Sequence, residues 1–185
     1  MIRFLALALG LLAGAAIAAP ETFRLDTARS SVGFTYRFMG GDTRGTMPVK
    51  SADMAIDLRD IAASRVNVTL DPTGARAGFI FATEAMKGPR VLDTAQHPEI
   101  SFRSTRITGT LQQARVTGDL TVRGVTRAVT LMAGLYRPRG TDPADLDTLT
   151  VLLTGTIDRR DFGADGFTAY VGPMIALRIM ARIEK

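Results

Sequence analysis

The chain of 185 residues contains no cysteine, and its one histidine is His97. Without cysteine, no disulfide can stabilise the fold, and thiol chemistry is excluded. A single histidine with no cysteine also argues strongly against a zinc site. Because disulfide cross-links are excluded in this way, the stability of the protein must come from backbone hydrogen bonds and a buried apolar core.

Long apolar runs are equally scarce. The one such run, residues 4–17, is shorter than the roughly 20 residues that a membrane-spanning helix needs. Arg3 precedes it, and a small-x-small cleavage sequence, Ala16-Ile17-Ala18, ends it. We therefore predict that residues 1–18 are a secretory signal peptide and that 19–185 form one mature domain. An uncleaved membrane anchor is the alternative. A twin arginine is absent, so we expect the general secretion route.

Charge of one sign is not concentrated anywhere in the sequence. The chain has 23 basic and 18 acidic residues, and removal of Arg3 lowers its formal net charge from +5 to +4. The basic residues are scattered over outward strand faces instead of forming a stripe, which argues against nucleic-acid binding. We expect them to serve solubility first and a transient attraction to anionic membrane surfaces second.

The most regular pattern in the sequence is ARVTGDLTVRGVTRAVTLMAGL, residues 114–135. Apolar and polar residues alternate there with period two in two successive stretches, which predicts two antiparallel strands with one dry and one wet face. Arg123 and Gly124 lie between the stretches, where Gly124 is free to adopt a positive φ in a hairpin turn. The predicted dry face consists of Val116, Leu120, Val122, Val129, Leu131 and Leu135.

The same alternation recurs along the rest of the chain. In the predicted strand 46–58, the apolar residues change from odd positions at Met47 and Val49 to even positions at Met54 and Ile56. One inserted residue would cause this change, so we predict a β-bulge at 50–52. The other predicted strands are 30–38, 46–58, 64–70, 99–104, 148–158 and 174–184, with a marginal edge strand at 22–25.

One segment follows a helical period instead. Asp71 and Pro72 form a good helix start, and apolar residues recur at helical spacing up to the Gly88-Pro89 stop. We predict one helix over about 76–87, whose apolar face covers an opening or an edge of the sheet. Phe79 and Met86 lie on that face and are candidates for a lid.

Eight short alternating strands with turns between them predict an all-β fold, either a sandwich or a barrel. An eight-stranded antiparallel barrel is of the size that is either filled by its own side chains or holds one small ligand. The alternation by itself leaves this choice open.

Catalytic residues are sparse. His97 is most simply a loop residue before a strand, and no nucleophile elbow is present. Asp161-Phe162-Gly163 has the letters of the kinase magnesium motif but lacks the other kinase motifs. Asp158 and Asp161, with the two arginines between them, are more typical of a structural ion-pair cluster than of acid–base catalysis.

Four segments in order resemble the YceI-like family, and their spacing matches over nearly all of the mature chain. They are LDTARSSVGF (25–34), HPEISFRST (97–105), GDLTVRGVTR (118–127) and IDRRDFG (157–163). The resemblance implies an exported, periplasmic, lipocalin-like barrel whose apolar lumen is associated with a long isoprenoid lipid, a polyprenyl phosphate or an isoprenoid quinone. The family often has a histidine where this chain has Arg29, and another near Phe38 and Met39.

The leading hypothesis is therefore a periplasmic carrier protein, not an enzyme, that uses no metal and no cofactor beyond the bound lipid. A strand of nine residues spans roughly 30 Å, which suits several isoprene units. The oligomeric state is left open, a homodimer being one option. The predicted ligand-binding residues are Phe34, Tyr36, Phe38, Phe79, Phe102, Leu120, Val122, Leu131 and Leu153.

Two alternatives remain at this stage. The first is an enzyme acting on a small apolar substrate, with Asp158 or Asp161 as acid or base. The second is a barrel filled by its own side chains that acts as a partner or stress protein, associated with a quinone-using membrane cytochrome.

Overall fold

A computed structural model describes residues 20–138, 140–142 and 146–185. The predicted signal peptide, 1–18, lies outside the described residues. Within them, strands dominate, accompanied by one α-helix, α1 (Ile80–Lys87), and short 3₁₀ helices. The strands are β1 (Glu21–Phe38), β2 (Gly41–Met47), β3 (Val49–Ile56), β4 (Arg65–Leu70), β5 (Ile100–Gly109), β6 (Ala114–Val122), β7 (Val125–Tyr136), β8 (Thr148–Asp158) and β9 (Val171–Glu184).

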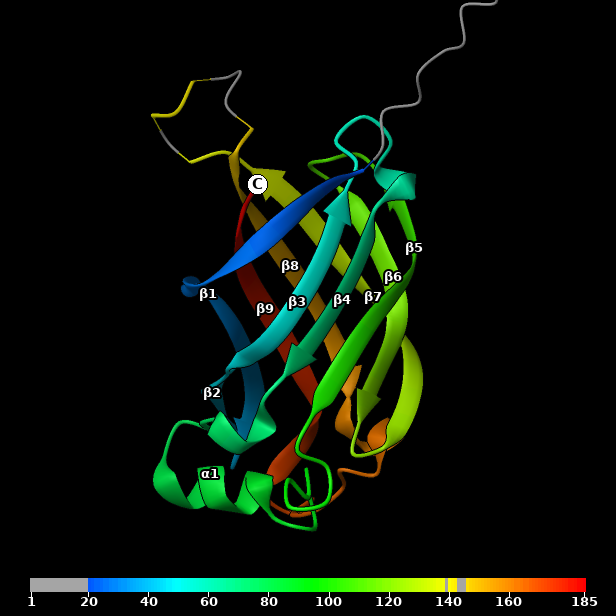
Figure 1. The fold of residues 1–185 in the computed structure, drawn as a ribbon. Coiled ribbons are helices and arrows are strands. Elements are labelled where there is room, and N and C mark those ends of the chain that lie inside the picture. The colour runs from blue at the N-terminus through cyan, green and yellow to red at the C-terminus, as the bar shows by residue number, and fades with distance from the viewer. Residues whose placement is uncertain (1–19, 139, 143–145) are drawn as a thin grey trace, which may run out of the picture.

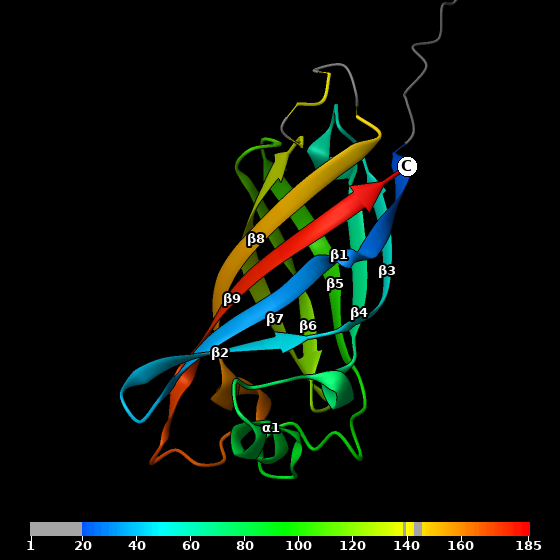
Figure 2. The ribbon, with the colours of Figure 1, turned by 90° about the vertical axis from the view of Figure 1, so that its left-hand side faces the viewer.

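These strands form a closed antiparallel barrel (Figures 1 and 2). Each strand pairs with its neighbours in the sheet, and β1 closes the barrel by pairing with β9. Strands β2 and β3 both pair with β1 and are separated by Pro48 alone, which has no amide hydrogen to donate. They form the two halves of one strand of the barrel wall, so the wall consists of eight strands. The predicted all-β, eight-stranded antiparallel barrel with one helix is confirmed.

The first strand of the barrel wall differs from the prediction. The expected strands 22–25 and 30–38 are a single strand, β1, whose pairing with β9 shifts between Asp26 and Ser31. The side chain of Asp26 accepts hydrogen bonds from the amides of Ala28 and Arg29, and so holds the excess residues in a bulge. These turn-like residues interrupt the alternation and made one strand look like two.

Strand β2 also begins earlier than predicted, at Gly41 instead of 46, because a two-residue turn at Met39 and Gly40 with positive φ returns the chain at once. The predicted bulge at 50–52 is confirmed, since the pairing of β3 with β4 shifts between Val49 and Ser51. The hairpin turn at Arg123 and Gly124 is confirmed as well, and both residues have positive φ.

The helix is shorter than the predicted 76–87. Asp71 does act as an N-cap, but of a 3₁₀ helix, Pro72–Gly74, where it accepts hydrogen bonds from the amides of Thr73 and Gly74. The chain then extends, and Arg76 pairs with Thr46 of β2 before α1 begins. Gly78 has a positive φ, and this interrupts the helical period.

The two ends of the barrel are built differently. Near the end that carries the C-terminus, a group of buried apolar side chains packs together inside the barrel, and we call this group the plug. At the opposite end lie α1, the 3₁₀ helix Arg159–Phe162 and the connection into β9 (Figures 1 and 2). The plug consists of Phe23, Met54, Ile56, Leu149 and Ile183.

Two glycines allow aromatic rings to lie flat against the inner wall. A Cβ atom on Gly118 would lie 2.5 Å from the ring of Phe102 and 2.5 Å from the carbonyl oxygen of Arg103. A Cβ atom on Gly45 would lie 2.2 Å from the ring of Phe34. Since real Cβ contacts are never so short, a side chain at either position would push the ring toward the barrel axis.

We predict that Gly118→Ala lowers the free energy of unfolding by about 1–3 kcal/mol, as overpacking of a core does. Gly41→Ala is the control, because its nearest neighbour, the carbonyl oxygen of Phe38, would lie 3.7 Å from the new Cβ atom. Urea titrations followed by circular dichroism measure both. Equal stabilities of the two variants would contradict the role of Gly118.

Candidate functional site

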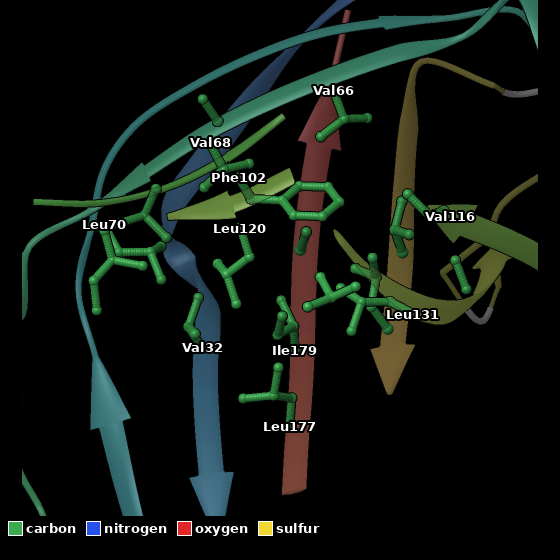
Figure 3. A pocket seen from close by; sticks show the side chains of 18 of the residues that line it. Val32, Val66, Val68, Leu70, Phe102, Val116, Leu120, Leu131, Leu177 and Ile179 are labelled. Carbon is green, nitrogen blue, oxygen red and sulfur yellow. The ribbon is translucent and has the colours of Figure 1, made fainter. Parts of the chain in front are cut away.

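The barrel encloses a cavity of about 300 Å³, which we call the lumen. Its walls are the inward faces of all eight strands of the barrel wall, and Met86 of α1 also contributes. Figure 3 shows side chains such as Val32, Phe102, Leu120 and Leu177 directed from different strands toward one common space. The volume lies within the range of small-molecule pockets. The barrel is therefore hollow, not filled by its own side chains.

The lumen is almost entirely apolar, and its few polar groups are already satisfied. The hydroxyl of Ser64 accepts a hydrogen bond from the amide of Asp57 at 2.9 Å. The hydroxyl of Ser30 donates to the carbonyl of Asp26 and accepts from the amide of Arg182. The lumen thus suits an apolar occupant that offers no hydrogen-bonding groups of its own.

Most of the predicted binding residues lie at the lumen, each on the face that its alternation predicts. The other three, Tyr36, Phe38 and Phe79, lie outside it. The predicted residues that line the lumen are Phe34, Phe102, Leu120, Val122, Leu131 and Leu153. No ligand is present, so their binding role stays a prediction.

A second cavity of about 200 Å³, which we call the vestibule, adjoins the lumen at the α1 end. Phe34, Met86, Val91, Arg159 and Ile175 line both cavities. The vestibule is rich in aromatic side chains from β1, α1 and the connection into β9. Its aromatic lining is Phe34, Tyr36, Phe38, Phe79, Phe81, Phe167 and Tyr170.

The three predicted residues outside the lumen all belong to the vestibule. The hydroxyl of Tyr36 donates to the carbonyl of Ala77 at 2.8 Å, and burial raises the pKa of this phenol above its usual value. The rings of Phe38 and Phe79 meet edge to face, with 5.3 Å between their centroids. These contacts fix the start of α1 to β1. The predicted position of the helix over an opening of the barrel is therefore correct.

Arg159 is the functional-site residue that the sequence did not single out. Its side chain is buried between lumen and vestibule, and its guanidinium faces the connection into β9. It donates to the carbonyl oxygens of Gly172 at 3.0 Å, Gly166 at 2.8 Å and Val171 at 3.1 Å, and also to that of Ala164. Burial lowers the pKa of this guanidinium below its usual value, and Asp165 and Asp158 oppose the shift.

Arg159 forms no ion pair among the described residues, so its charge is solvated by carbonyl dipoles instead. The arginine thereby fastens the connection 164–172 to the end of β8 and holds the shared wall of the two cavities. The motif that contains it was visible in the sequence, but nothing in the sequence distinguished Arg159 from its neighbour Arg160.

The carboxyls of the enzyme hypothesis lie in a structural cluster. Asp158 is the N-cap of the 3₁₀ helix Arg159–Phe162 and pairs with the exposed guanidinium of Arg160. Hydrogen bonds from the guanidinium of Arg160 and from its backbone amide lower the pKa of Asp158 to about 2. Asp158 is therefore ionised at neutral pH, and its pKa is poorly matched to general acid catalysis there. Asp161 is exposed and does not line either cavity.

His97 lies in the loop that precedes β5. Its amide donates to the carbonyl of Asp93, and its ring lies beside Gly124 of the β6–β7 turn. Within the described residues no group of three or more histidine, cysteine, aspartate or glutamate side chains could hold a metal ion. In the same part of the chain, no helix combines the length and the apolar character that crossing a membrane requires. The homodimer and the association with a cytochrome stay predictions.

The fold and the cavity together define a class, a closed antiparallel β-barrel of the lipocalin-like kind with a central apolar lumen. The comparison with known families then identifies the chain more closely. Residues 23–183 match the YceI-like domain, so the protein belongs to the YceI-like family. This confirms the resemblance that the four sequence motifs indicated.

A curated relative agrees with the family assignment, and solved structures share the fold. The chain is 30% identical over 151 residues to Protein YceI of Escherichia coli O157:H7, covering 81% of this chain and 78% of that protein. The crystal structure of Burkholderia cenocepacia BcnA has the same fold, with a TM-score of 0.75 at 21% identity and coverage of 85% and 98%. A polyisoprenoid binding domain from Saccharophagus degradans, implicated in plant cell wall breakdown, has a TM-score of 0.61 at 11% identity, with coverage of 88% and 97%.

We predict that Arg159→Met destabilises the protein by about 2–4 kcal/mol, because it leaves several buried carbonyl oxygens without a donor. The adjacent Arg160→Met removes an exposed ion pair and should cost at most about 1 kcal/mol. Urea titrations followed by circular dichroism compare the two. Equal losses would show that Arg159 does not fasten the connection.

Proposed function

We propose that this protein is a periplasmic carrier that sequesters a long isoprenoid lipid, a polyprenyl phosphate or an isoprenoid quinone, in the barrel lumen. The observation that carries the proposal is the lumen itself, a cavity of about 300 Å³ with an apolar wall. Membership of the YceI-like family supports it. The similar fold of a polyisoprenoid binding domain also supports it.

The physical chemistry of the lumen favours a hydrocarbon tail over a polar substrate. Each methylene-sized group that leaves water contributes roughly 0.8 kcal/mol. Ten or more such groups can outweigh the entropy lost when a flexible tail is ordered. Polar ligands gain nothing comparable, because the hydroxyls of Ser30 and Ser64 already have protein partners.

The two cavities suggest how the ligand is oriented. The C-terminal end of the barrel is plugged by side chains such as Leu149 and Ile183, which have no exposed surface. The α1 end leads into the vestibule instead. We therefore assign the tail to the lumen, with its far end against the plug, and the headgroup to the vestibule end. Arg29, where the family often has a histidine, pairs with Asp26 on the outer surface and lies at neither cavity.

Periplasmic location is supported by the predicted signal peptide, residues 1–18. Binding is favoured over catalysis because the chain offers the lumen no free acid, base or nucleophile among the described residues.

A tryptophan placed in the lumen tests the proposal, because the natural chain contains none. Phe102→Trp puts one fluorophore among the lumen side chains, and Arg103→Trp puts one on the exposed outer face of the same strand, β5. We expect a long-chain isoprenoid quinone, added in detergent micelles, to quench Phe102→Trp saturably near equimolar ratio and to quench Arg103→Trp only weakly and linearly.

A quinone is excluded as the ligand if neither variant shows saturable quenching, or if both are quenched alike, while circular dichroism shows both to be folded. The carrier proposal fails if, in addition, organic extraction of the natural protein yields no isoprenoid lipid. Organic extraction of the natural protein extends the test to a polyprenyl phosphate, which does not quench fluorescence. A lipid identified in that extract by mass spectrometry would name the headgroup.

A further inference from the structure

An unusual group of exposed apolar side chains surrounds the vestibule. Ile80 and Phe81 at the start of α1 are 71% and 81% exposed, and Met39 in the β1–β2 turn is 73% exposed. Side chains of this kind are normally buried, and a cluster of them marks an interaction site. We call this group the apolar tip, and it comprises Met39, Phe79, Ile80, Phe81 and Tyr170.

The members of the apolar tip come from three separate segments that the fold brings together. The amide of Met39 donates to the carbonyl of Tyr170 at 2.8 Å, which joins the β1–β2 turn to the connection into β9. The ring contact between Phe38 and Phe79 joins the same turn to α1. Figures 1 and 2 both place α1 and the connection into β9 at the end of the barrel opposite the C-terminus.

The segments that carry the tip also contain more basic than acidic residues. The segments 37–44, 76–90 and 165–174 contain five basic residues and three acidic ones, Asp42, Glu84 and Asp165. None of the five basic side chains forms an ion pair among the described residues, and Arg90 instead packs over the ring of Phe167. The five are Arg37, Arg44, Arg76, Lys87 and Arg90.

We propose that the apolar tip docks on the surface of an anionic lipid bilayer. The vestibule then opens directly toward this bilayer, and the carrier takes its ligand from the bilayer or returns it there. This inference rests on the proposed carrier function and adds to it a defined surface and partner. Aromatic and aliphatic side chains with basic neighbours are the combination by which proteins bind membrane interfaces.

The position of the tip favours a bilayer over a protein partner. Phe79, Phe81 and Tyr170 are exposed on the outside and line the vestibule on the inside, so the surface that docks also borders the ligand's route. The apolar tail of the ligand, moving between bilayer and lumen past these side chains, would avoid contact with water.

The test uses sedimentation of the mature chain, 19–185, with vesicles of phosphatidylcholine alone or with added phosphatidylglycerol. We expect binding to the anionic vesicles, weaker binding to the neutral ones, and a roughly tenfold loss for the double variant Met39→Asn, Ile80→Ser. Neither residue lines a cavity, and asparagine tolerates the positive φ of Met39. Met132→Ser, which removes an exposed apolar side chain from β7, is the control and should bind as the natural protein does.

Quinone uptake separates failure of docking from failure of the carrier function. The double variant should take up quinone from detergent micelles normally but slowly from vesicles. If the natural protein does not bind vesicles, or if the double variant binds like Met132→Ser, the docking proposal is wrong even though micelle uptake persists. If the natural protein takes up neither quinone nor polyprenyl phosphate from micelles, the carrier function fails, and the docking proposal that rests on it fails too.

Discussion

Closure of the sheet by the pairing of β1 with β9 is the constraint on which the rest of the structure depends. The pairing runs along nearly the full length of both strands, from Arg24–Glu184 to Phe38–Val171. It removes the free edges of the sheet and forces every second side chain to face one enclosed space. Because this space lies away from water, those side chains must be apolar. A cavity remains because the side chains do not fill the whole volume that the eight strands enclose.

The two ends of this tube have different tasks. One end is stabilised by close packing of the plug around Phe23 and Leu149. The other is held by specific polar contacts, above all the bonds from the buried guanidinium of Arg159 to the connection into β9. Such a construction leaves the α1 end formed by loops and a short helix, which is where a fold can open without disturbing its sheet. Access for a ligand and stability of the barrel are thus located at opposite ends.

Much of the barrel could be predicted from residue alternation, because each strand has one buried and one exposed face. The phase change between Val49 and Met54 even located the bulge of β3. The continuity of β1 could not be predicted, since the turn-forming Asp26 lies within the strand. The vestibule was equally hidden, because Phe38, Phe79 and Tyr170 come from segments whose proximity only the closed fold creates. Arg159 was missed because its partners are backbone carbonyls, which leave no pattern in the sequence.

The central claim is that the lumen holds a lipid with a long apolar tail. Native mass spectrometry of the protein, purified without detergent from the cells that naturally produce it, tests this most directly. The account predicts an added mass that corresponds to one isoprenoid lipid per chain and disappears on denaturation. A protein of bare polypeptide mass, which also stays unchanged after incubation with isoprenoid quinone and polyprenyl phosphate, would contradict it.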